Sequence, residues 1–159
     1  YQHPEKLIPL AIANAQELQP IPLYGSGAQV RNWIHVEDHC RGILQALERG
    51  RPGEVYHLGG DAELDNRSLL QRLLRILDRP LELIQPVPDR PGHDFRYALD
   101  SARARQELGW QPQIDLAAGL EATVAWYRHN QDWLAQARDG AYRQFYRSQY
   151  PALQATEAG

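Results

Sequence analysis

Two arginines lie beside turns, where a guanidinium group could bind an anionic ligand. Arg31 lies in an expected strand that follows the glycine turn at residues 25–27, and Arg90 lies in the loop 89–93, DRPGH. A guanidinium group can donate two parallel hydrogen bonds to phosphate oxygens. Arginines from two separate loops could therefore clamp a diphosphate, although a solvated or ion-paired arginine remains the alternative at each position.

Tyr24 ends the short extended segment 21–24 at the same glycine turn. An aromatic ring at such a position can be presented to a flat ligand, and base–aromatic stacking is a common way to bind a nucleotide base. Two interpretations stay open for Tyr24, which are stacking on a base and packing against neighbouring side chains.

Two histidines and one cysteine could suggest metal or nucleophile chemistry. His35 and His39 are four residues apart, but the acidic residue does not follow the first histidine as an HExxH zinc motif requires. We therefore expect no metal site here, and interpret the segment as a strand-to-helix junction in which Glu37 or Asp38 caps the helix. Cys40 has no identifiable catalytic partner, so we expect a buried small hydrophobe that forms no disulfide.

A dinucleotide-binding fingerprint is absent from the sequence. No GxGxxG follows an expected strand, and the glycines of GSG and LGG are better explained as turns. Any nicotinamide cofactor must therefore bind mainly to residues outside this chain. The sequence also contains no Met, so we expect it to be a piece of a longer protein.

Composition limits the remaining classes of protein. The chain has 159 residues, 43% of them hydrophobic and 23% charged, with a formal net charge of −3, which supports an ordinary core. The near-neutral charge gives no reason to expect nucleic-acid binding. No run approaches the ~18 consecutive apolar residues of a membrane-spanning helix. We expect a cytoplasmic protein without nucleic-acid or membrane partners.

Hydrophobic periodicity predicts helices that alternate with a few short strands. The expected helices are 4–18, 38–49, 67–78, 101–108 and 116–130, followed by a helical, aromatic-rich tail to about residue 150 and a frayed end at 151–159. The expected strands are 21–24, 30–36 and 54–60, with extended segments at 81–88 and within 89–100. In the second helix, we expect Ile43, Leu44 and Leu47 to face inward. This pattern indicates an α/β or α+β fold with too little parallel sheet for a complete doubly wound domain.

Five segments resemble the C-terminal half of the dTDP-glucose 4,6-dehydratase family, in the extended short-chain dehydrogenase/reductase superfamily. They are YQHPEKLIPLAI, IPLYGSGAQVRNWIHVEDH, GEVYHLGG, DRPGHDFRYALD and ARQELGWQP. The similarity covers residues 1–150, and PEKLIPL and DRPGHD are its most specific strings. The resemblance implies an α/β fold: the C-terminal substrate-binding part of an extended, NAD(P)-binding Rossmann-type enzyme, with its N-terminal Rossmann core missing.

The resemblance also implies an activity for the complete enzyme. Family members bind NAD on the N-terminal domain, oxidise C4 of dTDP-glucose, eliminate water across C5 and C6, and return the hydride to C6. The product is dTDP-4-keto-6-deoxyglucose, a precursor of rhamnose and other deoxysugars, and the parent enzyme is expected to be a homodimer. The family's YxxxK and Asp-Glu pairs precede this stretch, and no Tyr here has a Lys four residues later. We therefore expect no catalytic, cofactor-binding or metal-binding residue in this chain, and no turnover by it alone.

By resemblance, this half supplies the pocket for dTDP-glucose. The implied substrate-binding residues are Lys6, Leu7, Pro22, Leu23, Tyr24, Arg31, His57, Asp89, Arg90, Pro91, Gly92, His93 and Tyr142. Residues 22–24 would line the nucleoside site, the two arginines would bind the diphosphate, and residues 89–93 would wrap the nucleotide. Two positions depart from the family pattern, which usually has Asn at His57 and Asp at Asn32.

Two alternatives remain. The chain could belong to a related nucleotide-sugar epimerase or decarboxylase, because the YGxG and ELGWxP elements are shared with those enzymes. It could also be a non-catalytic remnant that binds nucleotide sugars or docks to a partner.

Overall fold

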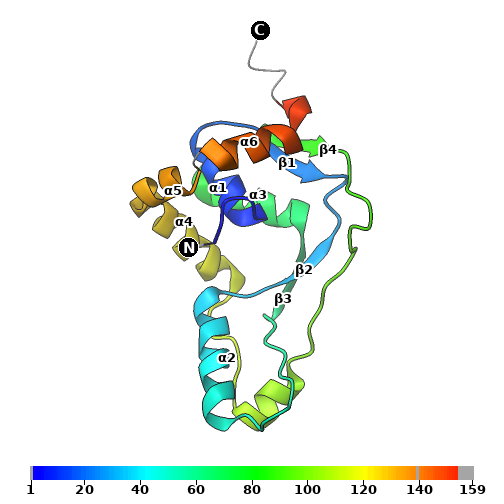
Figure 1. Ribbon diagram of the computed structural model, residues 1–159, viewed down its shortest axis with the longest axis vertical. Helices are drawn as coiled ribbons and strands as arrows, with labels where there is room; N and C mark the ends of the chain where they lie inside the picture. The colour runs from blue at the N-terminus through cyan, green and yellow to red at the C-terminus, as the bar shows by residue number, and fades with distance from the viewer. Residues whose placement is uncertain (1, 139, 154–159) are drawn as a thin grey trace. The chain divides into compact units, whose positions relative to one another are not determined.

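The computed structural model describes residues 2–138 and 140–153, which divide into two compact units (Figure 1). Unit 1 is formed by Tyr1–Ala28, Asn66–His93 and Glu121–Gly159, and unit 2 by Gln29–Asp65 and Asp94–Leu120. The chain thus begins in unit 1, crosses to unit 2, and returns to unit 1 twice and to unit 2 once. The part of the expected frayed end at 154–159 lies outside the described residues.

A short parallel sheet organises unit 1. Strand β1 (Ile21–Tyr24) pairs with β4 (Ile84–Val87), so that Ile21 lies opposite Ile84 and Tyr24 opposite Val87. The 3-10 turn η1 (Leu81–Leu83) leads directly into β4. The parallel direction requires a crossover, which α3 (Asn66–Leu77) and the excursion through unit 2 provide.

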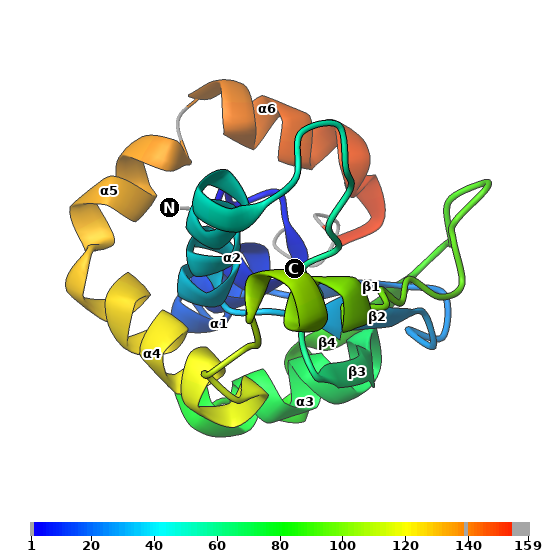
Figure 2. The same cartoon turned by 90° about the horizontal axis from the view of Figure 1, so that it is seen from below.

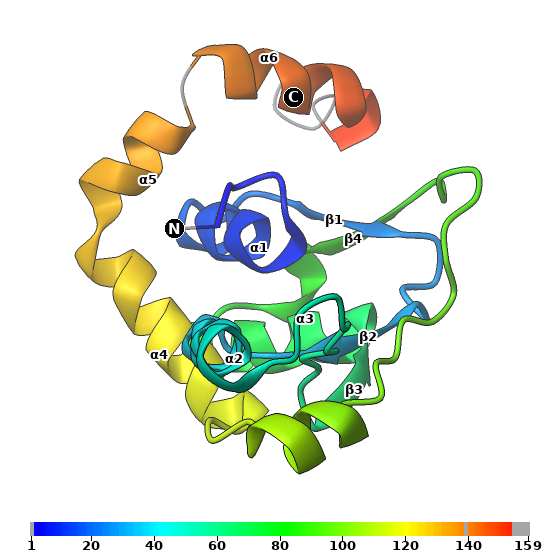
Figure 3. The ribbon, with the colours of Figure 1, turned by 60° about the horizontal axis from the view of Figure 1, so that its bottom comes forward.

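Helix α1 (Leu7–Gln16) lies between α3 and α6 (Gly140–Gln149), as Figure 3 shows. Residues 9–15 are all buried, so this helix is enclosed on several sides, which its small alanines permit. The expected helix 4–18 is longer than the observed one, because Leu18 is exposed and adopts a positive φ of 57° beyond the end of the helix.

The other helices of unit 1 follow the sequence pattern closely. Helix α3 buries five leucines at helical spacing, and Asp78 ends it with a left-handed φ of 55°. Helix α4 (Leu116–His129) begins in unit 2, and α5 (Gln131–Ala137), α6 and η3 (Pro151–Leu153) complete the tail. The predicted helical, aromatic tail is confirmed.

Unit 2 combines an antiparallel strand pair with α2 (Val36–Arg49). Strands β2 (Val30–Trp33) and β3 (Ala62–Asp65) lie beside each other in Figure 2, with Val30 opposite Asp65. The π-helical turn η2 (Ala104–Leu108) ends at Gly109, whose φ of 69° closes it. Trp110 packs there with Ala104 and Leu108 in a small core.

The predicted strand at 54–60 is wrong, and β3 was not predicted. Residues 54–60 have no regular secondary structure, although the Gly59 amide donates a hydrogen bond to Ser101 Oγ at 2.8 Å. A strand needs a neighbouring strand for its backbone groups, and among the described residues none pairs with this segment. Instead β2 pairs with the shorter, more polar AELD segment.

The prediction that α2 buries its apolar residues is also wrong. Its side chains Val36, Cys40, Ile43, Leu44 and Leu47, here called the α2 stripe, share one helical face and are all exposed, Leu47 to 81%. Cys40 is therefore not a buried hydrophobe. The helix instead buries Asp38 and Gly42 against the rest of unit 2. The other elements of unit 2 leave the stripe uncovered, so amphipathic spacing alone gave the wrong face.

Candidate functional site

The carboxyl ends of β1 and β4 bring Tyr24 next to the loop 89–93. The two strands are parallel, so Tyr24 and Val87 end the sheet at the same edge. The Gly25 amide donates to the Val87 carbonyl oxygen at 2.9 Å, and Gly25 turns the chain with a φ of 54°. A Cβ at Gly25 would lie 3.1 Å from an Asp89 carboxylate oxygen, which shows how closely turn and loop approach.

Four of the predicted site residues meet at this edge, and we call them the loop cluster: Tyr24, Asp89, Arg90 and His93. The rings of Tyr24 and His93 meet edge to face, with centroids 5.9 Å apart. The Arg90 Cζ atom lies 5.8 Å from the centroid of the Tyr24 ring. His93 Nδ1 lies 2.7 Å from Asp89 Oδ1, which also accepts a hydrogen bond from the Arg90 amide.

Charge in the loop cluster favours an anionic ligand at Arg90. The hydrogen bond from His93 lowers the pKa of Asp89, so its carboxylate stays ionised. In this form it accepts the hydrogen bonds from His93 and from the Arg90 amide that hold the loop 89–93. Although the His93 side chain is only 5% exposed, Arg90 is exposed, and its guanidinium group makes no hydrogen bond to the described residues. Pro91 and Gly92 are exposed at the loop tip, where Gly92 has a φ of 67°.

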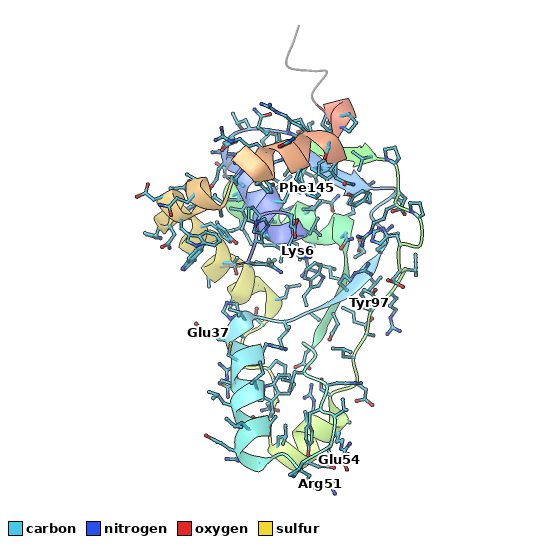
Figure 4. The ribbon with its side chains drawn as sticks, in the orientation of Figure 1. Lys6, Glu37, Arg51, Glu54, Tyr97 and Phe145 are labelled. Carbon is cyan, nitrogen blue, oxygen red and sulfur yellow. The ribbon has the colours of Figure 1, made fainter. Side chains whose placement is uncertain are left out.

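Arg31 lies in unit 2, where neighbouring backbone carbonyl groups and an aromatic ring fix its guanidinium group. Its guanidinium group donates to the carbonyl oxygens of Val30 at 2.7 Å and Asp94 at 2.9 Å, and stacks 4.5 Å above the centroid of the Tyr97 ring. Tyr97, which Figure 4 labels, also donates a hydrogen bond from its backbone to Val30. A short strand was expected within residues 89–100, but this segment makes only an isolated bridge, between Arg96 and Val30. Arg31 and Arg90 belong to different units, so a shared diphosphate clamp stays a prediction.

Four further predicted residues of unit 1 lie at the start of α1 and within β1. Lys6 is exposed at the start of α1, and Leu7 is half-buried beside it (Figure 4). Pro22 and Leu23 are buried in β1. A Cβ at Gly27 would lie 2.6 Å from the Leu23 side chain, so the turn packs directly on this leucine.

The predicted site residues Tyr142 and His57 belong to different units and differ in burial. Tyr142 is buried in unit 1, where its hydroxyl donates to the Pro4 carbonyl oxygen at 3.3 Å, two residues before Lys6. Burial raises the pKa of Tyr142 to about 12, so it is a neutral donor at physiological pH. His57 lies in unit 2, exposed, in the irregular segment between α2 and β3.

The sequence did not indicate the partners of the Tyr24 hydroxyl or the buried position of Asp38. Gln149 and Tyr150 both contact the Tyr24 hydroxyl, at 3.2 and 3.1 Å, although they follow it by about 125 residues. Asp38 was expected as a cap for α2, but His35 caps that helix, its ring accepting a hydrogen bond from the Glu37 amide. The fully buried Asp38 carboxylate instead accepts hydrogen bonds from Gln113 and Ile114 and pairs with Arg41.

Within the described ranges, no three His, Cys, Asp or Glu side chains gather to hold a metal ion. The same ranges contain no helix with the length and hydrophobicity that crossing a membrane requires.

Comparison with known proteins identifies the class. The model of the GDP-mannose 4,6 dehydratase family matches residues 1–123, and the chain belongs to this family. Its curated relatives include dTDP-glucose 4,6-dehydratases from Streptomyces niveus, 50% identical over 133 residues, and from Xanthomonas campestris pv. campestris strain B100, 46% identical over 152 residues. These matches cover 84% and 90% of this chain but only 40% and 43% of the relatives.

Solved structures give the same result for the fold. A dTDP-glucose 4,6-dehydratase from Streptomyces venezuelae, solved with NAD bound, is 52% identical with a TM-score of 0.81. A UDP-glucose 4-epimerase from Thermotoga maritima is 27% identical with a TM-score of 0.75. The matches cover 84% and 79% of this chain, and 41% and 40% of those chains. The predicted fold class, part of an extended short-chain dehydrogenase/reductase, is thereby confirmed, as is the resemblance to dTDP-glucose 4,6-dehydratases.

Proposed function

We propose that this chain is the nucleotide-sugar-binding part of a dTDP-glucose 4,6-dehydratase, a hydro-lyase of deoxysugar biosynthesis that forms dTDP-4-keto-6-deoxyglucose. The loop cluster carries this proposal, because it combines an aromatic ring with an exposed guanidinium group that makes no hydrogen bond to the described residues. The identity of about 50% to enzymes with that name supports the choice of nucleotide.

In this proposal each group of the loop cluster has a separate task. The Tyr24 ring faces the thymine base, and Arg90 binds the diphosphate through its exposed guanidinium group. Asp89 and His93 hold the loop in shape, while Lys6 and Leu7 approach the sugar. For Arg31 and His57, which lie in unit 2, substrate binding stays a prediction. Binding energy from the dTDP group would then align the glucose ring for the reaction.

NAD and the reactive groups would come from a Rossmann domain outside this sequence. The solved relatives hold NAD, whereas this chain has no dinucleotide fingerprint and no YxxxK. We propose that the α2 stripe packs against such a domain, since five exposed apolar side chains on one face favour burial. Because the sequence has no dinucleotide fingerprint, no step of the reaction is assigned to its residues. A homodimeric parent enzyme and a cytoplasmic location stay predictions.

The proposal is tested by titrating the purified chain with dTDP, UDP and GDP in a calorimeter. We expect saturable binding of dTDP, weaker binding of the other two, and no keto-sugar product when the chain is incubated with NAD and dTDP-glucose. Tighter binding of UDP would favour an epimerase, and tighter binding of GDP would favour a GDP-sugar enzyme. Absence of binding for all three would refute the proposal.

A further inference from the structure

The Tyr24 hydroxyl is held by the end of the last long helix. Tyr150 Oη lies 3.1 Å from Tyr24 Oη, and Gln149 Nε2 donates a hydrogen bond to the same hydroxyl at 3.2 Å. The rings of Tyr24 and Tyr150 are tilted by 45°, with centroids 6.1 Å apart. The hydroxyl end of Tyr24 is therefore fixed by residues that belong neither to β1 nor to the loop 89–93.

Tyr150 is itself firmly placed. It is 8% exposed, and its amide donates to the Tyr146 carbonyl oxygen at 3.0 Å. The Tyr146 ring centroid lies 4.9 Å from that of Tyr150, and the Tyr146 hydroxyl accepts a hydrogen bond from Asn14 Nδ2 at 2.9 Å. Tyr150, the residue directly after α6, is thus placed by the backbone and the ring of Tyr146, four residues earlier.

The other contacts of Tyr24 act on its ring. His93 meets the ring edge to face, and Arg90 lies near it. These contacts allow the ring to shift, since aromatic contacts tolerate a range of angles. A hydrogen bond at the far end of the side chain restricts that movement.

We infer that Tyr150, together with Gln149, is a positioning residue that fixes the Tyr24 ring for the nucleotide without touching the ligand itself. The ligand part of this inference rests on the proposed function. Burial and the Tyr24 hydrogen bond raise the pKa of Tyr150, which keeps its hydroxyl protonated near neutral pH. The end of α6 and the residue that follows it thereby become determinants of nucleotide affinity.

A double-mutant cycle on the whole 159-residue chain tests the inference. Tyr150→Phe, Tyr24→Phe and the double variant each keep the ring and remove a hydroxyl, and dTDP affinity is measured by calorimetry. We expect Tyr150→Phe to raise the Kd about fivefold, and to have less than a twofold further effect in the Tyr24→Phe background. Tyr146→Phe removes a hydroxyl from α6 but keeps the ring and backbone that contact Tyr150, so it should change the Kd by less than twofold.

A second measurement needs no ligand. In the NMR spectrum of ring-labelled tyrosine, Tyr150→Phe should shift the Tyr24 ring signals, whereas Tyr146→Phe should leave them in place. Circular dichroism and the Tm establish that each variant is folded. Unchanged Tyr24 signals, or equal effects of Tyr150→Phe on Kd with and without the Tyr24 hydroxyl, would overturn the inference. If the unaltered chain does not bind dTDP, the proposed function fails, and the NMR result alone decides whether Tyr150 positions Tyr24.

Discussion

Replacing Arg90 with alanine tests how the loop cluster binds a diphosphate. The guanidinium group is exposed, lies 5.8 Å from the Tyr24 ring centroid and makes no hydrogen bond to the described residues. Its removal therefore leaves no buried group unpaired in the free protein. Hydrogen bonds to charged groups contribute about 1.5–3 kcal/mol, and exposure places Arg90 at the lower end because water and salt screen it. We expect a loss of about 1.4 kcal/mol, or tenfold in Kd.

Calorimetric titration with dTDP measures this change for Arg90→Ala. The matched control is Arg72→Ala, which removes the same charge from an exposed position on α3 in the same unit. The control should change the Kd by less than twofold, and raising the salt concentration should reduce the difference between the Arg90 variant and the unaltered chain. Equal affinities for Arg90→Ala and the unaltered chain would remove Arg90 from the site, and equal losses for both variants would show only a general charge effect.

Three further predictions concern stability and surface. Asp38→Ala should lower the free energy of unfolding in urea by about 1–3 kcal/mol, because it leaves the part-buried amides of Gln113 and Ile114 without their acceptor. The exposed Glu37→Ala should cost less than about 0.5 kcal/mol, and similar losses for both variants would contradict this role of Asp38. Burial raises the pKa of Tyr127 to about 12, above its unfolded value near 10, so its contribution is full below pH 10 and is lost as the pH rises toward 12. Urea unfolding at pH 9–12 should show this decline for the unaltered chain and a smaller one for Tyr127→Phe, and parallel curves would argue against it. Leu47→Ser should reduce the binding of a hydrophobic dye by at least a third with no loss of stability, whereas unchanged dye fluorescence would show that the α2 stripe is not the exposed apolar surface.

Local patterns predicted those parts of the fold that depend on neighbouring residues. The five leucines of α3 and the left-handed closure at Gly109 were predictable, because helix periodicity and glycine conformation act over a few positions. The pairing of β2 with β3 was not, because it joins segments about 30 residues apart and the AELD strand has little β propensity. The exposure of Leu47 was also unpredictable, since spacing identifies an apolar face without identifying what covers it.

The sequence indicated the residues of the site that lie in motifs, but not those brought to it by helix packing. Tyr24 and the loop 89–93 could be named from motifs, and the parallel pairing of β1 with β4 then brings them together. Tyr150 could not, because its contact with Tyr24 depends on where α6 packs. The spacing of Tyr142, Tyr146 and Tyr150 was a usable signal for a shared helix face, but it did not indicate the partner.

The most direct test of the binding site is NMR of the isotopically labelled chain during titration with dTDP. The account predicts that the largest amide shifts occur at the β1 end and glycine turn, residues 24–27, and in the loop 89–93. The same titration of the Arg90→Ala variant should need about tenfold more dTDP to reach half of the shift. Shifts confined to other parts of the chain, with residues 24–27 and 89–93 unchanged, would contradict the assignment of the nucleotide to the loop cluster.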